Sequence, residues 1–268
     1  MSPADTPCSE ENRVSDAPFP SWHGERAQQL HAAIITRLHL LLATPYDSPL
    51  NPGFVRDYRQ VLTTFEEYQQ EVMRYHGRMP SCRAGCATCC GHWVEDVNSF
   101  EAALIAGEVL RRPPPAIDAI MHQCRSDMAA LEQLADIRDA RTGTVEEELH
   151  FDETDILLGA FYQLRRPCPL LSNGRCSVYD LRPLTCRIYF SFSHPSRCDP
   201  DHIHDEGTAT FILDVDEEAN ALFDRLHERF CLFEGESGLR RVLLRYLEHE
   251  RNGAAVRDGG THPPGCDC

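Results

Sequence analysis

Residues 82–90 read Cys-Arg-Ala-Gly-Cys-Ala-Thr-Cys-Cys, which places four of the chain's 13 cysteines within nine residues. A second set follows further along the chain at Cys168, Cys176, Cys186 and Cys198. Thiolates at such short spacings can converge on a tetrahedral ion or a metal cluster without a large core around them. We call residues 80–94 the first cysteine block and residues 165–206 the second, and together they predict a metal site.

The expected cellular compartment determines whether the thiols bind metal or form disulfides. The first 21 residues contain no apolar targeting segment, and no run of about 18 apolar residues occurs anywhere in the chain. We therefore expect a cytoplasmic protein with no membrane partner. Thiols stay reduced in that compartment, so metal binding is favoured over disulfide pairing, which remains the alternative.

The charge of the chain limits its partners. The formal net charge of -16 argues against a nucleic-acid partner, which needs a basic surface. All 26 residues counted as lysine or arginine are arginine, which excludes lysine bases and Schiff-base lysines. A compositional bias of the genome explains the missing lysine most simply, although an enzyme that modifies lysines could also avoid them.

Acidic residues avoid both cysteine blocks. None lies between Val72 and Val94, and only Asp180 lies between Arg165 and Cys198. Thiolates carry negative charge even when they bind metal, so nearby guanidinium groups would offset that charge and donate hydrogen bonds. We therefore regard Arg182 and Arg187 as candidates for contacts to sulfur or to an anionic group of a cofactor or substrate. The alternative for each arginine is an ordinary ion pair.

The spacing inside the first block leaves several kinds of centre open. Cys82, Cys86 and Cys89 also match CxxxCxxC, the spacing of radical S-adenosylmethionine enzymes, but the rest of the chain lacks the repeated strand-helix units of those enzymes. The adjacent Cys89 and Cys90 must point in different directions. This pair indicates two metals, a multi-iron cluster, or one ligand beside a free thiol.

Histidines close to the second block are further candidate ligands. In the segment His202-Ile-His204 the two imidazoles would lie on one side of an extended chain, close to Cys198. Histidine with carboxylate favours iron or zinc with open coordination positions, whereas the simpler interpretation is a solvated polar loop. His92 is either an extra ligand or, more simply, a packed strand residue.

The remaining sequence predicts a mainly α fold: a helical domain with a cysteine-rich metal-binding insertion and a small β-hairpin. We expect a disordered leader at 1–21, a single helical metal-binding domain at 22–252, and a flexible tail at 253–268 in which Cys266 and Cys268 could capture metal. Cys124 and Cys231 are expected at core positions. Apolar periodicity, caps and prolines predict helices at 22–43, 54–75, 98–110, 116–140, 154–164, 217–233 and 237–251. Residues 188–193 and 208–215 are predicted to pair as the hairpin.

The neighbours of the cysteines add a resemblance. The segments are residues 82–90, Cys168-Pro-Leu-Leu, Gly174-Arg-Cys176, Val178-Tyr-Asp-Leu-Arg-Pro183 and Thr185-Cys-Arg-Ile-Tyr189. Together they resemble the YkgJ-type cysteine-cluster proteins, a family described as zinc- or iron-chelating domains that includes the flagellin lysine methylase. The resemblance covers about residues 80–198 and implies metal binding through the cysteines rather than one particular reaction.

These observations define the predicted site and function. The predicted metal ligands are Cys82, Cys86, Cys89, Cys90, Cys168, Cys176, Cys186, Cys198, His202 and His204. We expect an iron-sulfur or iron-dependent enzyme that modifies a side chain of a protein or peptide substrate. The alternatives are a zinc-stabilised helical scaffold and a metal carrier. The sequence leaves open the substrate, the use of S-adenosylmethionine and the oligomeric state.

Overall fold

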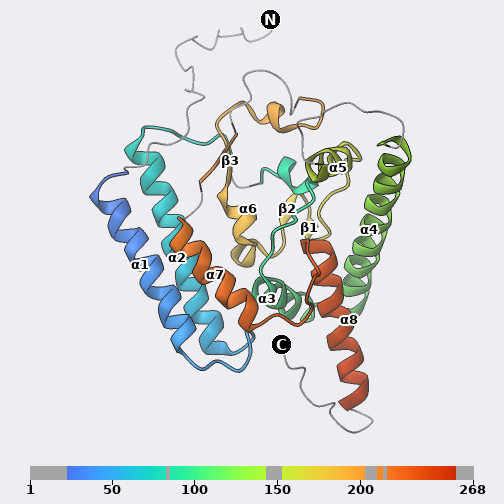
Figure 1. The fold of residues 1–268 in the computed structure, drawn as a ribbon, viewed down its shortest axis with the longest axis horizontal. Helices are drawn as coiled ribbons and strands as arrows, with labels where there is room; N and C mark the ends of the chain where they lie inside the picture. The colour runs from blue at the N-terminus through green and yellow to red at the C-terminus, as the bar shows by residue number, and fades with distance from the viewer. Residues whose placement is uncertain (1–22, 83–84, 143–152, 203–209, 214–215, 258–268) are drawn as a thin grey trace, which may run out of the picture.

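The computed structural model describes residues 23–82, 85–142, 153–202, 210–213 and 216–257. This part of the chain contains eight α-helices and two short antiparallel sheets, which confirms the predicted mainly α fold (Figure 1). Among the described helices, none combines the length and the apolar character needed to span a bilayer. The leader at 1–21, Cys266, Cys268 and His204 lie outside the described residues.

The long helices fall into two groups, and the first group contains three of them. The helices α1 (Glu25–Ala43), α2 (Pro52–Tyr75) and α7 (Glu217–Arg229) lie side by side (Figure 1). Apolar residues at helical spacing on α1, including Ile34 and Leu38, are fully buried against α2 and α7. The periodicity in the sequence therefore located these helices correctly. However, α7 ends at Arg229, before the predicted end at residue 233.

A second group contains α4 (Pro114–Thr142), α5 (Glu153–Gln163) and α8 (Leu239–Arg257), in which α8 contacts α4 and α4 contacts α5. Here α8 continues to Arg257, past the predicted end at residue 251 and into the predicted tail. The sequence Gly-Ala-Ala-Val-Arg after Asn252 explains the continuation, because a single glycine is tolerated when strong helix formers follow it.

The helix α3 (Ser99–Val109) joins the two groups and contacts both α7 and α8. It is apolar on every side, which is typical of a buried central helix. Phe100 belongs to the core of α1, α2 and α7, whereas Ile105 belongs to the core of α4 and α8. The predicted capping box of Asn98 and Glu101 is present at its start.

The cysteine-rich segments lie between the two helical groups (Figure 1). The short elements here are η1 (Thr88–Gly91), β1 (Leu171–Ser172), β2 (Arg175–Cys176), η2 (Tyr179–Leu181), α6 (Leu184–Ile188), β3 (Tyr189–Ser191), η3 (Pro195–Cys198) and β4 (Thr210–Ile212), where η denotes a 3₁₀ helix. The pairing of β3 with β4 confirms the predicted hairpin, with shorter strands than expected. Ile188 belongs to α6 instead of a strand, and the sequence did not predict the pair β1 and β2.

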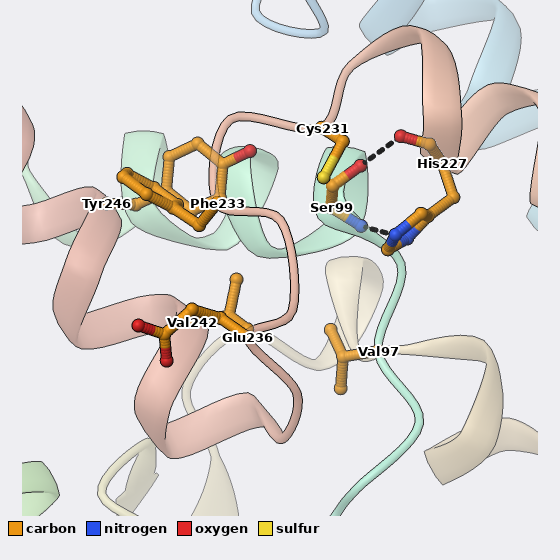
Figure 2. A pocket seen from close by; sticks show the side chains of 8 residues that line it. All are labelled: Val97, Ser99, His227, Cys231, Phe233, Glu236, Val242 and Tyr246. Atoms are coloured by element: carbon orange, nitrogen blue, oxygen red, sulfur yellow. Dashed lines mark hydrogen bonds between the residues drawn. The ribbon is translucent and has the colours of Figure 1, made fainter. Parts of the chain in front are cut away.

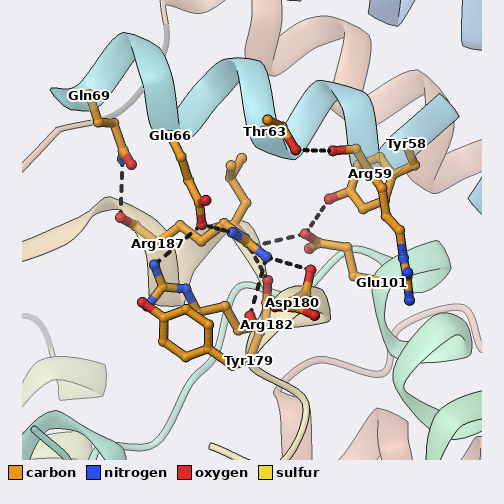
Figure 3. A network of polar contacts seen from close by, with 11 residues as sticks. Tyr58, Arg59, Thr63, Glu66, Gln69, Glu101, Tyr179, Asp180, Arg182 and Arg187 are labelled. Carbon is orange, nitrogen blue, oxygen red and sulfur yellow. Dashed lines mark hydrogen bonds and ion pairs between the residues drawn. The ribbon is translucent and has the colours of Figure 1, made fainter. Parts of the chain in front are cut away.

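The buried carboxylate of Glu101 ties the second cysteine block to the helices (Figure 3). It accepts hydrogen bonds from the Tyr58 hydroxyl at 2.6 Å, from the Leu184 backbone N–H at 2.9 Å and from the Asn98 backbone N–H at 3.2 Å. Because Leu184 stands two residues before Cys186, this carboxylate helps to fix the position of that cysteine. A buried carboxylate needs several donors of this kind to remain in the core.

Candidate metal centre

Backbone hydrogen bonds join the two cysteine blocks. The Cys168 N–H donates to the Cys90 carbonyl at 2.7 Å, although the two residues are far apart in sequence. At the start of the first block, the Ser81 N–H donates to the Ser191 carbonyl at 2.8 Å. In addition, η3 of the second block lies against η1 of the first. The fold therefore brings all eight cysteines of the two blocks into one region.

Four of these cysteines form what we call the Cys82 group: Cys82, Cys86, Cys89 and Cys198. The Cys82 sulfur accepts a hydrogen bond from the Ser191 N–H at 3.3 Å, which anchors it to β3. Burial raises the pKa of Cys82, and the negative charges of Cys89, Cys86 and Cys198 raise it further. These contributions place the four cysteines in the same part of the structure.

The other four form the Cys90 group: Cys90, Cys168, Cys176 and Cys186. The pKa of Cys90 is raised by a hydrogen bond to Cys89, by burial, and by the charges of Cys89, Cys168 and Cys176. Burial raises the pKa of Cys186 as well, with contributions from Cys168, Cys89 and Cys176. Cys168 and Cys176 also pack against the core of α4 and α8.

Cys89 connects the two groups. The Cys90 thiol donates to the Cys89 sulfur, and this bond lowers the pKa of Cys89, with a smaller contribution from the Arg182 charge. Cys89 is also exposed, whereas the other seven cysteines, Cys90 among them, are half-buried.

The eight thiols are ligands that suit zinc or iron, although their side chains do not converge on a common point. All eight cysteines are free thiols, which argues against the disulfide alternative. Within the described residues, no three histidine, cysteine or acidic side chains converge closely enough to hold an ion. Two sets of four thiols match the ligand chemistry of zinc-thiolate and iron-sulfur sites, and ligation would require their side chains to rotate.

The loop at 194–206 contains Cys198 of the Cys82 group as well as His202 and His204, and the structure describes it as far as His202. Tyr162 holds the start of this loop, because its hydroxyl donates to the Cys198 carbonyl and to the Thr88 carbonyl. Arg165 forms ion pairs with Asp199 at 2.9 Å and with Asp201 at 2.7 Å. His202 is exposed and its backbone N–H donates to the Asp199 carbonyl. Its role as a ligand, and that of His204, stay predictions.

The two predicted arginines have different surroundings (Figure 3). Arg187 is buried, pairs with Glu66, and donates to the Asp180 carbonyl at 2.7 Å and the Arg182 carbonyl at 3.0 Å. The Arg182 guanidinium lies 4.2 Å from the centre of the Tyr179 ring, and its Nε is buried without a hydrogen-bond partner. Arg187 therefore fixes the turn before Cys186, whereas Arg182 acts on the charge of Cys89.

Sequence reasoning missed one buried network, formed by Asp127 of α4, Arg166 and Arg240 of α8. The fully buried Asp127 carboxylate binds the Arg240 Nε at 2.8 Å and the Arg166 Nε at 2.6 Å. Arg240 also donates from Nη1 to the His92 carbonyl at 3.1 Å. No local sequence pattern predicts this network, because its residues come from separate elements.

His92 follows η1 and is packed, although not in a strand as expected. Its ring stacks on that of Tyr162 with 3.6 Å between the ring centres, and burial lowers its pKa to about 4. The imidazole is therefore neutral at pH 7. This stack favours the interpretation of His92 as a packed residue.

A separate pocket lies where α3, α7 and α8 meet (Figure 2). Cys231, which the sequence places at a core position, lines this pocket and is only half-buried, whereas Cys124 is fully buried as expected. The Ser99 hydroxyl donates to the His227 carbonyl at 2.7 Å, and the Ser99 N–H donates to His227 Nδ1 at 3.0 Å. These bonds join α3 to α7 and do not activate the serine as a nucleophile.

Comparison with known proteins agrees with the cysteine pattern. A family model with the signature CxxCxxCC, described as a "putative zinc- or iron-chelating domain", matches residues 81–205. The match confirms the resemblance to the cysteine-cluster family and supports metal binding by this segment. No curated protein and no solved structure matches the chain. The matched segment contains all eight cysteines and excludes α1, α2, α7 and α8.

Proposed function

We propose that this chain, whose residues 81–205 match the cysteine-cluster family, holds an iron centre that takes part in modifying a protein or peptide side chain. One observation carries the metal-binding part of the proposal. The Cys168 N–H donates to the Cys90 carbonyl, and this contact gathers eight free thiols from two distant blocks in one region. Gathering reduced thiols in a folded protein favours metal ligation.

Iron is favoured over zinc by the number and arrangement of the thiols. A single structural zinc ion needs four ligands, and eight exceed that number. The charge of Cys89 raises the pKa of thiols in both groups, Cys82 in one and Cys90 and Cys186 in the other, an arrangement that suits a multi-iron centre better than two closed zinc sites. The exposure of Cys89 would leave one side of such a centre accessible.

A structural zinc site remains the second candidate, because Cys168 and Cys176 pack against the core of α4 and α8. Ligands in that position would stabilise the fold without needing access for a substrate. A metal carrier is the third alternative. It differs from the other two in the rate at which it would release the ion.

Anaerobic purification followed by metal analysis and visible spectroscopy distinguishes these candidates. We expect bound iron together with the charge-transfer absorption of a thiolate-bound iron centre. A colourless protein with stoichiometric zinc would establish the structural alternative instead. Rapid loss of the ion to a weak chelator, with the fold retained, would indicate a carrier.

Single cysteine variants test the ligand set. Cys86→Ser and Cys176→Ser should each lower the metal content and the thermal stability, because binding energy at such sites contributes to folding energy. Cys231→Ser is the matched control, since Cys231 lies in the separate pocket and belongs to neither group. If either test variant retains as much metal and stability as the control, that group is not a ligand set.

The enzymatic part of the proposal rests on the resemblance to the flagellin lysine methylase and on the absence of lysine from the chain. Its test is incubation of the metal-loaded protein with lysine-containing peptides and S-adenosylmethionine under anaerobic conditions. Mass spectrometry should detect a peptide that has gained a methyl group. Unmodified peptides across a library of varied sequences would leave metal binding as the function and contradict methylation.

A further inference from the structure

Arg240 is the most deeply buried cation of the described residues, with 1% of its surface exposed. Its Nε donates to Asp127 Oδ2 at 2.8 Å, and its Nη1 donates to the carbonyl of His92, two residues after Cys90. This helix residue lies outside the segment that matches the cysteine-cluster family. It therefore links α8, which the family model does not cover, to the first cysteine block.

The guanidinium is held in a fixed position. Its central carbon lies 5.2 Å from the centre of the Trp93 ring and 5.1 Å from that of Phe161. The second oxygen of Asp127 is already bound to Arg166 at 2.6 Å and to Gln123 at 2.7 Å. Aromatic faces and a fully engaged carboxylate leave the guanidinium little freedom to move.

One donor of Arg240 lacks an acceptor. Its Nη2 is buried and has no hydrogen-bond partner. Leaving a buried donor unsatisfied is costly, and nearly all buried polar groups in folded proteins have a partner. The N–H groups of Nη2 are therefore able to donate to an acceptor next to the guanidinium.

The Cys90 group is the part of the predicted site that lies next to Arg240. The His92 carbonyl, which accepts from Nη1, follows Cys90 by two residues, and the Cys90 carbonyl accepts from the Cys168 N–H at 2.7 Å. Cys168 also packs against the apolar core that contains Leu239, the residue before Arg240 on α8. Cys168 is therefore the candidate acceptor among the predicted ligands.

We infer that Arg240 is a positioning residue of the metal centre: its cation offsets the thiolate charge of the Cys90 group, and its Nη2 serves as a donor to sulfur there. This inference rests on the proposed function. Four thiolates around a divalent ion leave a net negative charge, which a buried guanidinium would stabilise. Removing the cation should therefore weaken metal retention and lower the reduction potential of a redox-active centre.

The test uses full-length protein purified anaerobically with its metal, as wild type, Arg240→Lys, Arg240→Met, Asp127→Asn and the double variant Asp127→Asn with Arg240→Met. The readouts are the affinity for the metal, measured by competition with a chelator, the reduction potential and the unfolding temperature. The double variant removes both charges of the pair, so that no buried carboxylate is left without its Arg240 partner. It keeps the test valid if Arg240→Met alone fails to fold.

We expect the double variant to bind the metal about 10- to 100-fold more weakly than Asp127→Asn, in the range typical for groups that contact metal ligands. Arg240→Lys should recover part of this loss, because it retains the charge. Equal metal affinity and potential in the double variant and Asp127→Asn would overturn the inference and make Arg240 only the partner of Asp127. Failure of the wild type to hold any metal would instead refute the proposed function, and this inference with it.

Discussion

At the scale of single residues, Arg187 and Arg182 should respond differently to replacement by methionine. Arg187→Met removes hydrogen bonds to two backbone carbonyl groups and the ion pair with Glu66, so we expect a loss of about 3 kcal/mol in the free energy of unfolding. Arg182→Met removes a more exposed group and should cost under about 1 kcal/mol. Urea unfolding of both variants measures the difference.

The two variants should rank in the opposite order when the measured property is the spectrum or the metal retention of the loaded protein. Arg182 influences the charge of Cys89, so its loss should alter the spectrum or the metal retention of the loaded protein more than its stability. Equal effects of both variants on stability would contradict the assignment of Arg187 to the turn. The sequence identified both arginines but could not separate their roles, because their partners Glu66 and Tyr179 come from different elements.

A histidine pair between the start of α1 and the end of α2 should make stability depend on pH. His23 Nδ1 lies 3.0 Å from His76 Nε2. Burial lowers the pKa of both, and the charges of His76 on His23 and of Arg78 on His76 lower them further. The folded state therefore binds fewer protons than the unfolded state, so this contribution to stability is full above pH 6.5 and is lost as the pH falls below it.

The double variant His23→Gln with His76→Gln tests this effect. We expect the free energy of unfolding to decrease less between pH 7.5 and pH 5.5 in the variant than in the wild type. Urea titrations at the two pH values provide the comparison, and carboxylates elsewhere contribute equally to both proteins. An identical decrease in both proteins would show that the pair does not titrate in this range.

At the scale of elements, a substitution at Gly174 in the turn between β1 and β2 should lower the stability of the protein. Asn173 has a φ of 50° and Gly174 a φ of 71°, both in the left-handed region. Gly174→Ala should cost about 1 kcal/mol, because a side chain is strained there even though space is available. Asn173→Gly is the matched control and should change stability by less than about 0.5 kcal/mol.

This turn also presents Cys176, so the strained variant should weaken the metal site. Cys176 is the last residue of β2 and pairs with Leu171 across the hairpin. We expect Gly174→Ala to hold metal less tightly than Asn173→Gly in a chelator competition. Equal metal retention would show that the hairpin adjusts without moving the cysteine.

The elements themselves show what a sequence can reveal. The long helices were predictable because each has its own apolar period, and the start of α3 was predictable from Asn98 and Glu101. The elements β1, β2 and α6 have two to five residues, too few for a period to appear. Their form depends on contacts such as that of Glu101 with Leu184, which local sequence does not encode.

At the scale of the whole molecule, removing the metal should loosen the cysteine-rich segments more than the helical core. Hydrogen exchange of chelator-treated protein should become faster in residues 85–94 and 165–198. Exchange in α1 and α2 should stay slow, because their buried apolar residues pack without the cysteines. Restored protection after addition of iron is the control. Unchanged exchange in both cysteine segments would mean that the metal does not order them.

The cysteines of the candidate site could be identified from the sequence, whereas the buried ion pair next to the site could not. Eight cysteines and their acid-poor surroundings are visible along the chain. The contact between Asp127 and Arg240 spans 113 residues, and nothing in the neighbourhood of either residue marks it. A buried ion pair of this kind becomes recognisable only once α4 and α8 are packed together.

The attachment of α8 to the first cysteine block also has a consequence for biosynthesis. Leu239 and Gly238 donate backbone hydrogen bonds to Val94 and Glu95, and Arg240 reaches a carbonyl that lies 148 residues earlier in the chain. Ribosomes add roughly 5–20 residues per second, so the first block waits on the order of ten seconds for its covering helix. During translation these thiols are open to metal donors and to oxidants alike. The nascent polypeptide thus passes through an interval in which the first block lacks the hydrogen bonds that residues 238–240 supply once α8 has emerged and docked.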